Sequence, residues 1–188
     1  AFAYRHSRFN TTDRGRYAVT RVDYRLKLHG HPTLRYADLQ KAFAINTTPT
    51  LCEVAETVRR IRQSKGMLIV EGDPDSRSAG SFFKNPIVAR EQATRVASVA
   101  GSEPPQFPAG PGSEACVKLS AAWLIEKAGF TKGYTLGPAG ISSKHTLALV
   151  NRGGATATAI LLLADKIREA VETKFGIQLQ MEPVMLGF

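Results

Sequence analysis

The amino-acid sequence predicts an α+β fold, in which strands and helices are mixed without a regular strand–helix–strand rhythm. One stretch alternates apolar and polar residues with the period of a strand, whereas several others repeat apolar residues at helical spacing. Glycine, proline and threonine residues punctuate these stretches where elements begin or end. A hydrophobic content of 43% is sufficient for a packed core.

The first part of the chain is expected to contain a strand, a helix and a second, short strand. Residues 18–28 alternate apolar and polar side chains, which predicts a half-buried strand. A helix should follow, because Thr48 or Thr50 can cap its start and Pro49 suits its first turn. Its apolar face would consist of Leu51, Val54, Ala55, Val58 and Ile61. Residues 67–70 predict the short strand.

The second part alternates strands and helices irregularly. Ile87 and Val88 predict a strand, and the Pro- and Gly-rich residues 101–112 predict a loop. A helix from about residue 120 to 128 should stop at Gly129. The remaining expected elements are a buried strand at 147–150, a helix from about 155 to before Gly176, and extended segments at 177–179 and 184–186.

Length and apolar patterning limit the class of protein. The 188 residues suit one large domain or two small ones, and the longest apolar run, residues 159–164, is too short to span a bilayer. Arg5, His6 and Arg8 interrupt any secretory signal, and the first residue is not methionine, which suggests a processed chain or a fragment. Cys52 and Cys116 are expected to be buried thiols in a reducing cytoplasm.

The formal charge of +9 attracts polyanions, whether nucleic acid, an acidic membrane or a phosphorylated small ligand. The basic residues are dispersed and form no long run, which weakens the nucleic-acid interpretation and leaves a nucleotide-like ligand open. The sequence lacks a dinucleotide-binding glycine motif, a phosphate-loop lysine and a serine-hydrolase elbow. The histidines lack carboxylate or cysteine neighbours at metal-ligand spacing, so no metal site is predicted.

The segment at residues 78–86 is unusual, because two phenylalanines lie between a Gly-Ser pair and a Lys-Asn-Pro turn. One interpretation is a strand end whose glycine gives a tight bend and whose phenylalanines fill the core. The other is that Gly80 lets a ligand approach the backbone, where Ser81 offers a hydroxyl. The residues alone do not separate the two.

Segments spread along nearly the whole chain carry the motifs of one family. They are Tyr-Arg-x-Ser-x-Phe at 4–9, the segment at 79–86, Lys-Leu-x-Ala-x-Trp-Leu-Ile at 118–125, residues 145–151 and residues 175–182. In this order they resemble the UDP-N-acetylenolpyruvoylglucosamine reductases. These flavoenzymes use FAD and NADPH to make UDP-N-acetylmuramate for bacterial peptidoglycan, in the cytoplasm.

The resemblance implies three catalytic residues. Arg5 matches the arginine near the substrate carboxylate, where a guanidinium stabilises developing negative charge without titrating. Ser81 matches the serine that protonates the substrate carbon, with Lys65 or Lys84 supplying a favourable field. Glu182 matches a second acid–base or electrostatic carboxylate.

The resemblance also implies binding residues. Those matching contacts to the UDP-sugar substrate are Arg62, Lys65, Asn85, Lys118, Lys132 and His145, and those matching flavin contacts are Tyr4 and Gly80. Lys118 and Lys132 would suit a diphosphate. The chain departs from the family pattern at Phe107, where some members have tyrosine, and at Pro183-Val184, which replaces a valine followed by a basic residue.

The family's glycine-rich, flavin-binding amino-terminal part is absent from this sequence. Residues 1–66 would therefore be the remainder of the second flavin-domain lobe with a bridging helix, and residues 67–188 the substrate-binding domain. The missing part would be a partner for this chain, and neither nucleic acid nor membrane is expected as one. Alternatives are a related flavin oxidoreductase acting on another substrate and a non-enzymatic module that binds polyanions.

Overall fold

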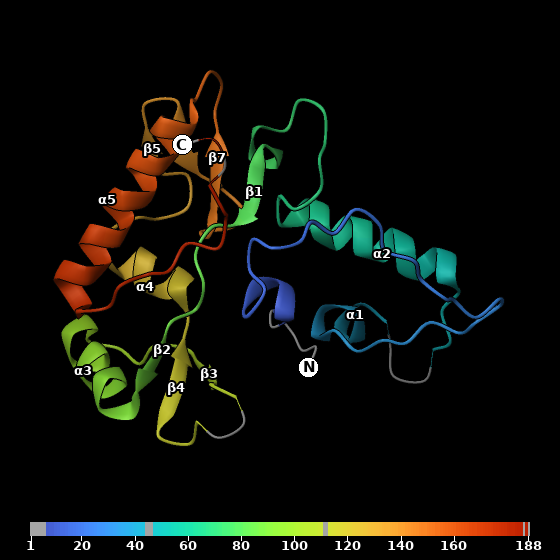
Figure 1. Ribbon diagram of the computed structural model, residues 1–188, viewed down its shortest axis with the longest axis horizontal. Helices are drawn as coiled ribbons and strands as arrows, with labels where there is room; N and C mark the ends of the chain where they lie inside the picture. The colour runs from blue at the N-terminus through green and yellow to red at the C-terminus, as the bar shows by residue number, and fades with distance from the viewer. Residues whose placement is uncertain (1–6, 44–46, 111–112, 186, 188) are drawn as a thin grey trace.

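The computed structural model describes residues 7–43, 47–110, 113–185 and 187, and it confirms the mixed α+β class (Figure 1). Two antiparallel sheets lie in the region from residue 78 onward, with strand orders β1-β7-β6-β5 and β2-β4-β3. The strands are β1 (Ser78–Ser81), β2 (Ile87–Ala89), β3 (Gln106–Pro108), β4 (Cys116–Leu119), β5 (Thr135–Leu136), β6 (Ala139–Ile141) and β7 (Ala148–Asn151).

Helices flank the sheets, and the elements that precede β1 in the described residues are all helices. Their bounds are η1 (Arg8–Asn10), α1 (Ala37–Ala42), α2 (Leu51–Ser64), η2 (Pro74–Ser76), α3 (Arg90–Ala100), α4 (Ala121–Lys127) and α5 (Ala157–Phe175). Helix α5 packs against β6 and β7 and also contacts α3 and α4. In Figure 1, α5 runs along the outer side of the four-stranded sheet, whereas α1 and α2 lie on the other side of β1.

The expected third helix supplies the centre of the core. Leu163, Ala164, Ile167 and Val171 of α5 are fully buried, as their helical spacing predicts. Thr156 begins the helix by accepting a hydrogen bond from the Ala159 amide at 3.2 Å. The residues that form the main buried cluster run from Phe82 to Leu179, so this core belongs to the region after η2.

The two phenylalanines after β1 fill that core. Phe82 and Phe83 are 4% and 1% exposed, and their rings meet edge to face with centroids 5.5 Å apart. Gly80 has a φ of +81°, and a Cβ added there would meet no other atom within 4 Å. The segment therefore has the features of both interpretations: a packed strand end, and a backbone that faces open space.

Helix α2 begins at the predicted cap. The Thr50 side chain accepts a hydrogen bond from the Glu53 amide at 3.2 Å, and the Glu53 carboxylate accepts one from the Thr50 amide at 2.7 Å.

The prediction of a short strand at residues 67–70 is wrong. Gly66 is left-handed and Met67 donates its amide to the Arg62 carbonyl at 2.7 Å, so this backbone terminates α2.

The half-buried strand expected at residues 18–28 is also wrong. This segment has no ladder hydrogen bonds to the described strands, and its side chains lie open to solvent. The apolar members Val19, Val22, Tyr24, Leu26 and Leu28 are 60–84% exposed. A strand requires a neighbouring strand for its backbone groups, and the described residues provide none.

Smaller differences have local causes. The predicted loop at 101–112 contains β3, because Gln106, Phe107 and Pro108 pair with β4. The helix expected from about residue 120 to 128 is present as α4, and the first two residues of the Lys-Leu-x-Ala-x-Trp-Leu-Ile motif belong to β4. Helix α3 was not predicted, and Cys52 is exposed rather than buried. Residue 186 of the last extended segment lies outside the described residues.

Candidate active site

An irregularity in β1 presents Ser81. The pairing of Ser78 with Val150 and of Ser81 with Ala148 places one more residue on β1 than on β7 between these points. Gly80 lies in this bulge with its positive φ, and its amide donates a hydrogen bond to the Ser78 hydroxyl oxygen at 3.2 Å. Bulges turn a side chain out of the regular alternation of a strand. The Gly-Ser sequence therefore fixes the direction of the Ser81 hydroxyl.

The hydroxyl of Ser81 lies next to the imidazole of His145. Ser81 Oγ and His145 Nε2 are 3.2 Å apart, and both residues are half-buried. His145 lies just before β7, three positions from Ala148, which pairs with Ser81. Strand pairing thus brings together two residues that are 64 positions apart in the sequence.

Two acidic residues hold the turn that carries His145. The carboxylate of Asp75, which is 4% exposed, accepts hydrogen bonds from the amide of Ser143 at 2.9 Å and from its hydroxyl at 2.5 Å. Asp73 forms an ion pair with Lys144 at 2.5 Å. Arg152 lies 3.8 Å from Asp75 on the other side. These contacts anchor the residues immediately before His145 to η2 and fix its position.

The surroundings of His145 favour the neutral form of its imidazole. Burial lowers the pKa of His145 below its ordinary value of 6.5, and the positive charges of Lys132 and Lys65 lower it further. Lys65 ends α2 and also pairs with Asp38 at 2.5 Å, whereas Lys132 lies in the exposed loop after α4. Two of the predicted binding lysines therefore face the same histidine from different elements.

Glu182 lies beside Ser81 because the C-terminal segment pairs with the residues after β1. The Glu182 amide donates to the Phe82 carbonyl at 2.9 Å, and Met181 forms a bridge with Phe83. Ser81 and Glu182 line one cavity of about 390 Å³, together with Ala79 and Pro183. The structure thus brings two of the predicted catalytic residues to a common cavity.

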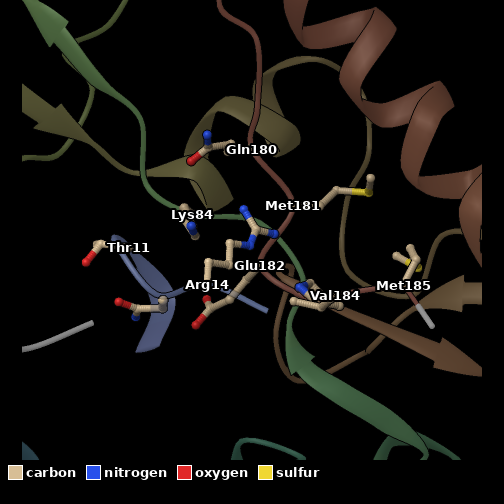
Figure 2. A pocket seen from close by; sticks show the side chains of 10 residues that line it. Thr11, Arg14, Lys84, Gln180, Met181, Glu182, Val184 and Met185 are labelled. Carbon is tan, nitrogen blue, oxygen red and sulfur yellow. The ribbon is translucent and has the colours of Figure 1, made fainter. Parts of the chain in front are cut away.

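A larger cavity of about 680 Å³ lies on the other side of Glu182. Figure 2 shows Arg14, Lys84 and Glu182 lining it from separate parts of the chain. Asp13 accepts from Arg8 at 2.5 Å and from Arg16 at 3.1 Å, and these contacts hold the turn that carries Arg14. Arg14 and Lys84 make this cavity suitable for an anionic group.

A third cavity, of about 260 Å³, opens on the α2 side of β1. Arg62, Gly80 and Ser81 are among its lining residues. Arg62 is exposed at the end of α2, so its guanidinium is available to a ligand that reaches Ser81 from this side. The predicted residues Arg62, Gly80 and Ser81 therefore share one opening.

The remaining predicted residues lie elsewhere or cannot be placed. Asn85 Oδ1 accepts a hydrogen bond from the Ala121 amide at 2.9 Å, and this contact supports the start of α4. A contact between Asn85 and a ligand would therefore use Nδ2. Lys118 lies in β4, opposite Ile87 and Phe107, and it does not line either cavity that the described part of the chain forms at Ser81. Tyr4 and Arg5 lie outside the described residues.

Sequence reasoning missed the direct partner of Ser81. Lys65 or Lys84 was expected to assist it, whereas among the described residues the hydroxyl meets His145. Sequence position carries no signal for this pair. The anchoring role of Asp73 and Asp75 was also missed, although two aspartates flanking a proline shortly before the Gly-Ser segment were a usable signal.

Comparison with known proteins identifies the family of the chain. Residues 73–186 match the model of the UDP-N-acetylenolpyruvoylglucosamine reductase C-terminal domain. The chain belongs to the UDP-N-acetylenolpyruvoylglucosamine reductase family. The reductase of Thermobifida fusca is 48% identical over 99% of this chain and 53% of the relative, and that of Streptomyces coelicolor is 48% identical over 100% and 50%. The reductase of Corynebacterium diphtheriae is 44% identical over 98% and 49%.

The chain spans about half the length of the reductases that it matches. The matched C-terminal domain includes Ser81, His145 and Glu182, whereas Arg62 and Lys65 precede it. Within the described residues, no group of three or more His, Cys, Asp or Glu side chains is arranged to hold a metal ion. The described helices include none with the length and apolarity needed to cross a membrane.

Proposed function

We propose that this chain is the substrate-binding and catalytic part of an FAD- and NADPH-dependent reductase that converts UDP-N-acetylenolpyruvoylglucosamine to UDP-N-acetylmuramate. The observation that carries the proposal is the shared cavity of Ser81 and Glu182. A proton donor and a carboxylate on one cavity suit a reaction in which a carbon gains a proton while charge moves into an adjacent carboxylate. Such a reaction serves peptidoglycan synthesis, and we expect it in the cytoplasm.

The residues at Gly80 fit a flavin ring. The α-carbon of Gly80 faces space that a Cβ would enter, and Arg62 and Ser81 border that space. A planar ring can approach a backbone that lacks a side chain. Gly80, together with Tyr4, would contact the flavin, which when bound supplies the hydride.

This chain's own side chains would then bind the substrate and complete the proton chemistry. Ser81 Oγ delivers the proton to the substrate α-carbon, and Glu182 and Arg5 control the charge that develops on the adjacent carboxylate. Lys118 and Lys132 bind the diphosphate, and Arg62, Lys65, Asn85 and His145 contact the rest of the UDP-sugar. The cavity bordered by Arg14 and Lys84 would accept an anionic part of the same ligand.

The complete enzyme would also contain a flavin-binding half. The exposed apolar residues between 18 and 28 support this proposal, because a segment with unpaired backbone groups and exposed apolar side chains gains stability by pairing with another strand. Residues 1–66 would join that half, and residues 67–188 would form the substrate domain. Hydrogen exchange at residues 18–28 should be slower with the flavin-binding half present, and equal exchange in both forms would refute the pairing.

A fusion tests the activity directly. In it, this chain replaces the matched region of the Thermobifida fusca reductase. The fusion should oxidise NADPH over many catalytic cycles only when UDP-N-acetylenolpyruvoylglucosamine is present. Mass spectrometry should then detect a product that is heavier than this substrate by two hydrogens. A flavin-loaded fusion that reduces no UDP-sugar would refute the proposed function. Strong, salt-dependent retention on nucleic acid by such an inactive fusion would favour a polyanion-binding module instead.

A further inference from the structure

The contact between Ser81 and His145 carries an inference beyond the binding role that the family pattern gives this histidine. We propose that His145 supplies Ser81 with the proton that the serine passes on, so that the two side chains form a relay to the substrate α-carbon. The inference rests on the proposed function, and it adds a second proton carrier behind the residue that touches the substrate. His145 acts through Ser81 and is therefore a positioning and proton-supplying residue.

The chemistry of serine requires such a partner. A hydroxyl that gives its proton to carbon becomes an alkoxide, which is a strongly unfavourable product near neutral pH unless a second proton arrives. An imidazolium can deliver that proton, because its ordinary pKa of about 6.5 lies close to neutrality. A lysine ammonium at its ordinary pKa holds its proton much more tightly.

The relay balances without a further reactant. The electron pair of the substrate carbanion forms the new C–H bond as the Ser81 Oγ–H bond breaks. The His145 Nε2–H bond then breaks as a new Oγ–H bond forms, which restores the serine hydroxyl and leaves a neutral imidazole. Solvent water returns a proton to the imidazole before the next cycle. No oxidation or reduction occurs in these proton steps.

The geometry suits direct transfer. The 3.2 Å between Oγ and Nε2 is at the outer limit of the usual range for a catalytic hydrogen bond. The turn before His145 is held by contacts of Asp75 with Ser143 and of Asp73 with Lys144. The Ser142 hydroxyl also accepts from the amides of Lys144 and His145. The imidazole position is therefore set through the backbone and the neighbouring side chains.

The charges around His145 make the protonation of its imidazole depend on whether the anionic substrate is bound. Lys132 and Lys65 oppose a positive imidazole, whereas the Asp73–Lys144 ion pair beside it is close to neutral overall. A substrate with a diphosphate and a carboxylate would offset the two lysine charges. His145 should then take up a proton as the substrate binds, which prepares the relay only when it is needed.

Proton uptake provides a readout that a merely structural role would not change. Calorimetry of substrate binding to the oxidised Thermobifida fusca fusion, in two buffers with different ionisation enthalpies, should give net proton uptake near pH 7. His145→Gln should abolish most of that uptake, whereas His31→Gln, a change at an exposed histidine, should leave it intact. Equal uptake in the His145→Gln and wild-type fusions would overturn the proposal.

Half-reactions separate the relay from simple substrate binding. In the His145→Gln fusion, flavin reduction by NADPH should stay normal, which also reports an intact fold. Re-oxidation by saturating substrate should fall by about 10²-fold, and it should lose the decline at high pH that the relay predicts for the wild type. Added imidazole should restore part of the rate. Ser81→Ala should also remove the pH dependence, but imidazole should not rescue it.

The outcomes distinguish the two proposals. A higher substrate KM in His145→Gln, with an unchanged saturated rate and pH profile, would make His145 a binding residue and would leave the reductase function intact. A wild-type fusion that fails to reduce the UDP-sugar would instead overturn the function and the relay together. Full re-oxidation in Ser81→Ala would remove the serine, and with it the relay, from the proton pathway.

Discussion

Asp75 should be essential for the order of the turn that carries His145. Its buried carboxylate accepts two hydrogen bonds from Ser143, at 2.9 Å and 2.5 Å, and lies 3.8 Å from Arg152. A hydrogen bond to a charged group contributes about 1.5–3 kcal/mol. Asp75→Ala should lower the opening free energy at Ser143 by at least about 1.5 kcal/mol, which corresponds to roughly tenfold faster amide exchange. Hydrogen-exchange mass spectrometry of peptides covering residues 142–148 measures this change.

Matched variants isolate the cause. Asp75→Asn keeps an acceptor for the Ser143 amide and loses the charge, so it should have an intermediate effect. Asp165→Ala removes an exposed carboxylate that pairs with Arg168, and it should change exchange at 142–148 by no more than experimental error. Faster exchange at residues 90–100 of α3 would indicate general unfolding. Unchanged exchange at 142–148 in Asp75→Ala would refute the anchoring role.

The effect of Asp75 should also depend on pH. Burial alone would raise the pKa of this carboxyl, but hydrogen bonds from Ser143 and Ser142 and the charge of Arg152 lower it overall below 3.8. A lowered pKa stabilises the fold above pH 3.8, and this stabilisation is lost as pH falls through the folded-state value. The difference between wild type and Asp75→Asn should therefore shrink in acid below pH 3.8.

Three further changes test other parts of the structure. Gly80→Ala should cost about 1–2 kcal/mol in unfolding free energy because of its φ of +81°, and Gly72→Ala, with φ +79°, should cost the same. Only the Gly80 change should slow flavin re-oxidation by substrate in the fusion, and equal rates would remove Gly80 from the site. Thr50→Ala should destabilise α2 by about 1 kcal/mol in urea unfolding, whereas Thr48→Ala should be nearly neutral. Lys132→Gln should raise the pKa of His145 in an NMR titration, whereas Lys166→Gln on the exposed side of α5 should not. Because the lowered pKa favours neutral His145, its contribution to stability is present above pH 6.5 and falls as pH drops through the folded-state value.

Local signals predicted the helices that have both a cap and a periodic apolar face. Thr50 and Gly66 bound α2, and Thr156 and Gly176 bound α5, so these ends follow from short-range hydrogen bonds. The alternation at residues 18–28 gave the wrong element for a physical reason. Alternation describes how side chains would divide between two faces, but a strand forms only where another strand accepts its hydrogen bonds.

Motif resemblance selected Ser81 and Glu182, because each residue lies in a segment with its own sequence pattern, and the structure brings both to one cavity. It did not identify the partner of Ser81. That contact depends on the register between β1 and β7 and on the extra residue at Gly80, and both are long-range properties of the sheet. The same limit applies to Arg14 and Lys84, which share a cavity although they are far apart in sequence.

Different side chains control the position and the charge of the His145 ring. A carboxylate in contact with an imidazole would raise its pKa and keep it positively charged. Here Asp75 contacts Ser143 and Asp73 contacts Lys144, so both fix the turn without bonding to the His145 ring. Burial and the charges of Lys132 and Lys65 therefore act on the ring without an opposing carboxylate contact among the described residues. Reversing the charge of Lys132, as in Lys132→Glu, should therefore favour protonated His145 without substrate and reduce proton uptake on binding. Undiminished proton uptake in Lys132→Glu would show that the positive charge of Lys132 does not control the protonation of His145.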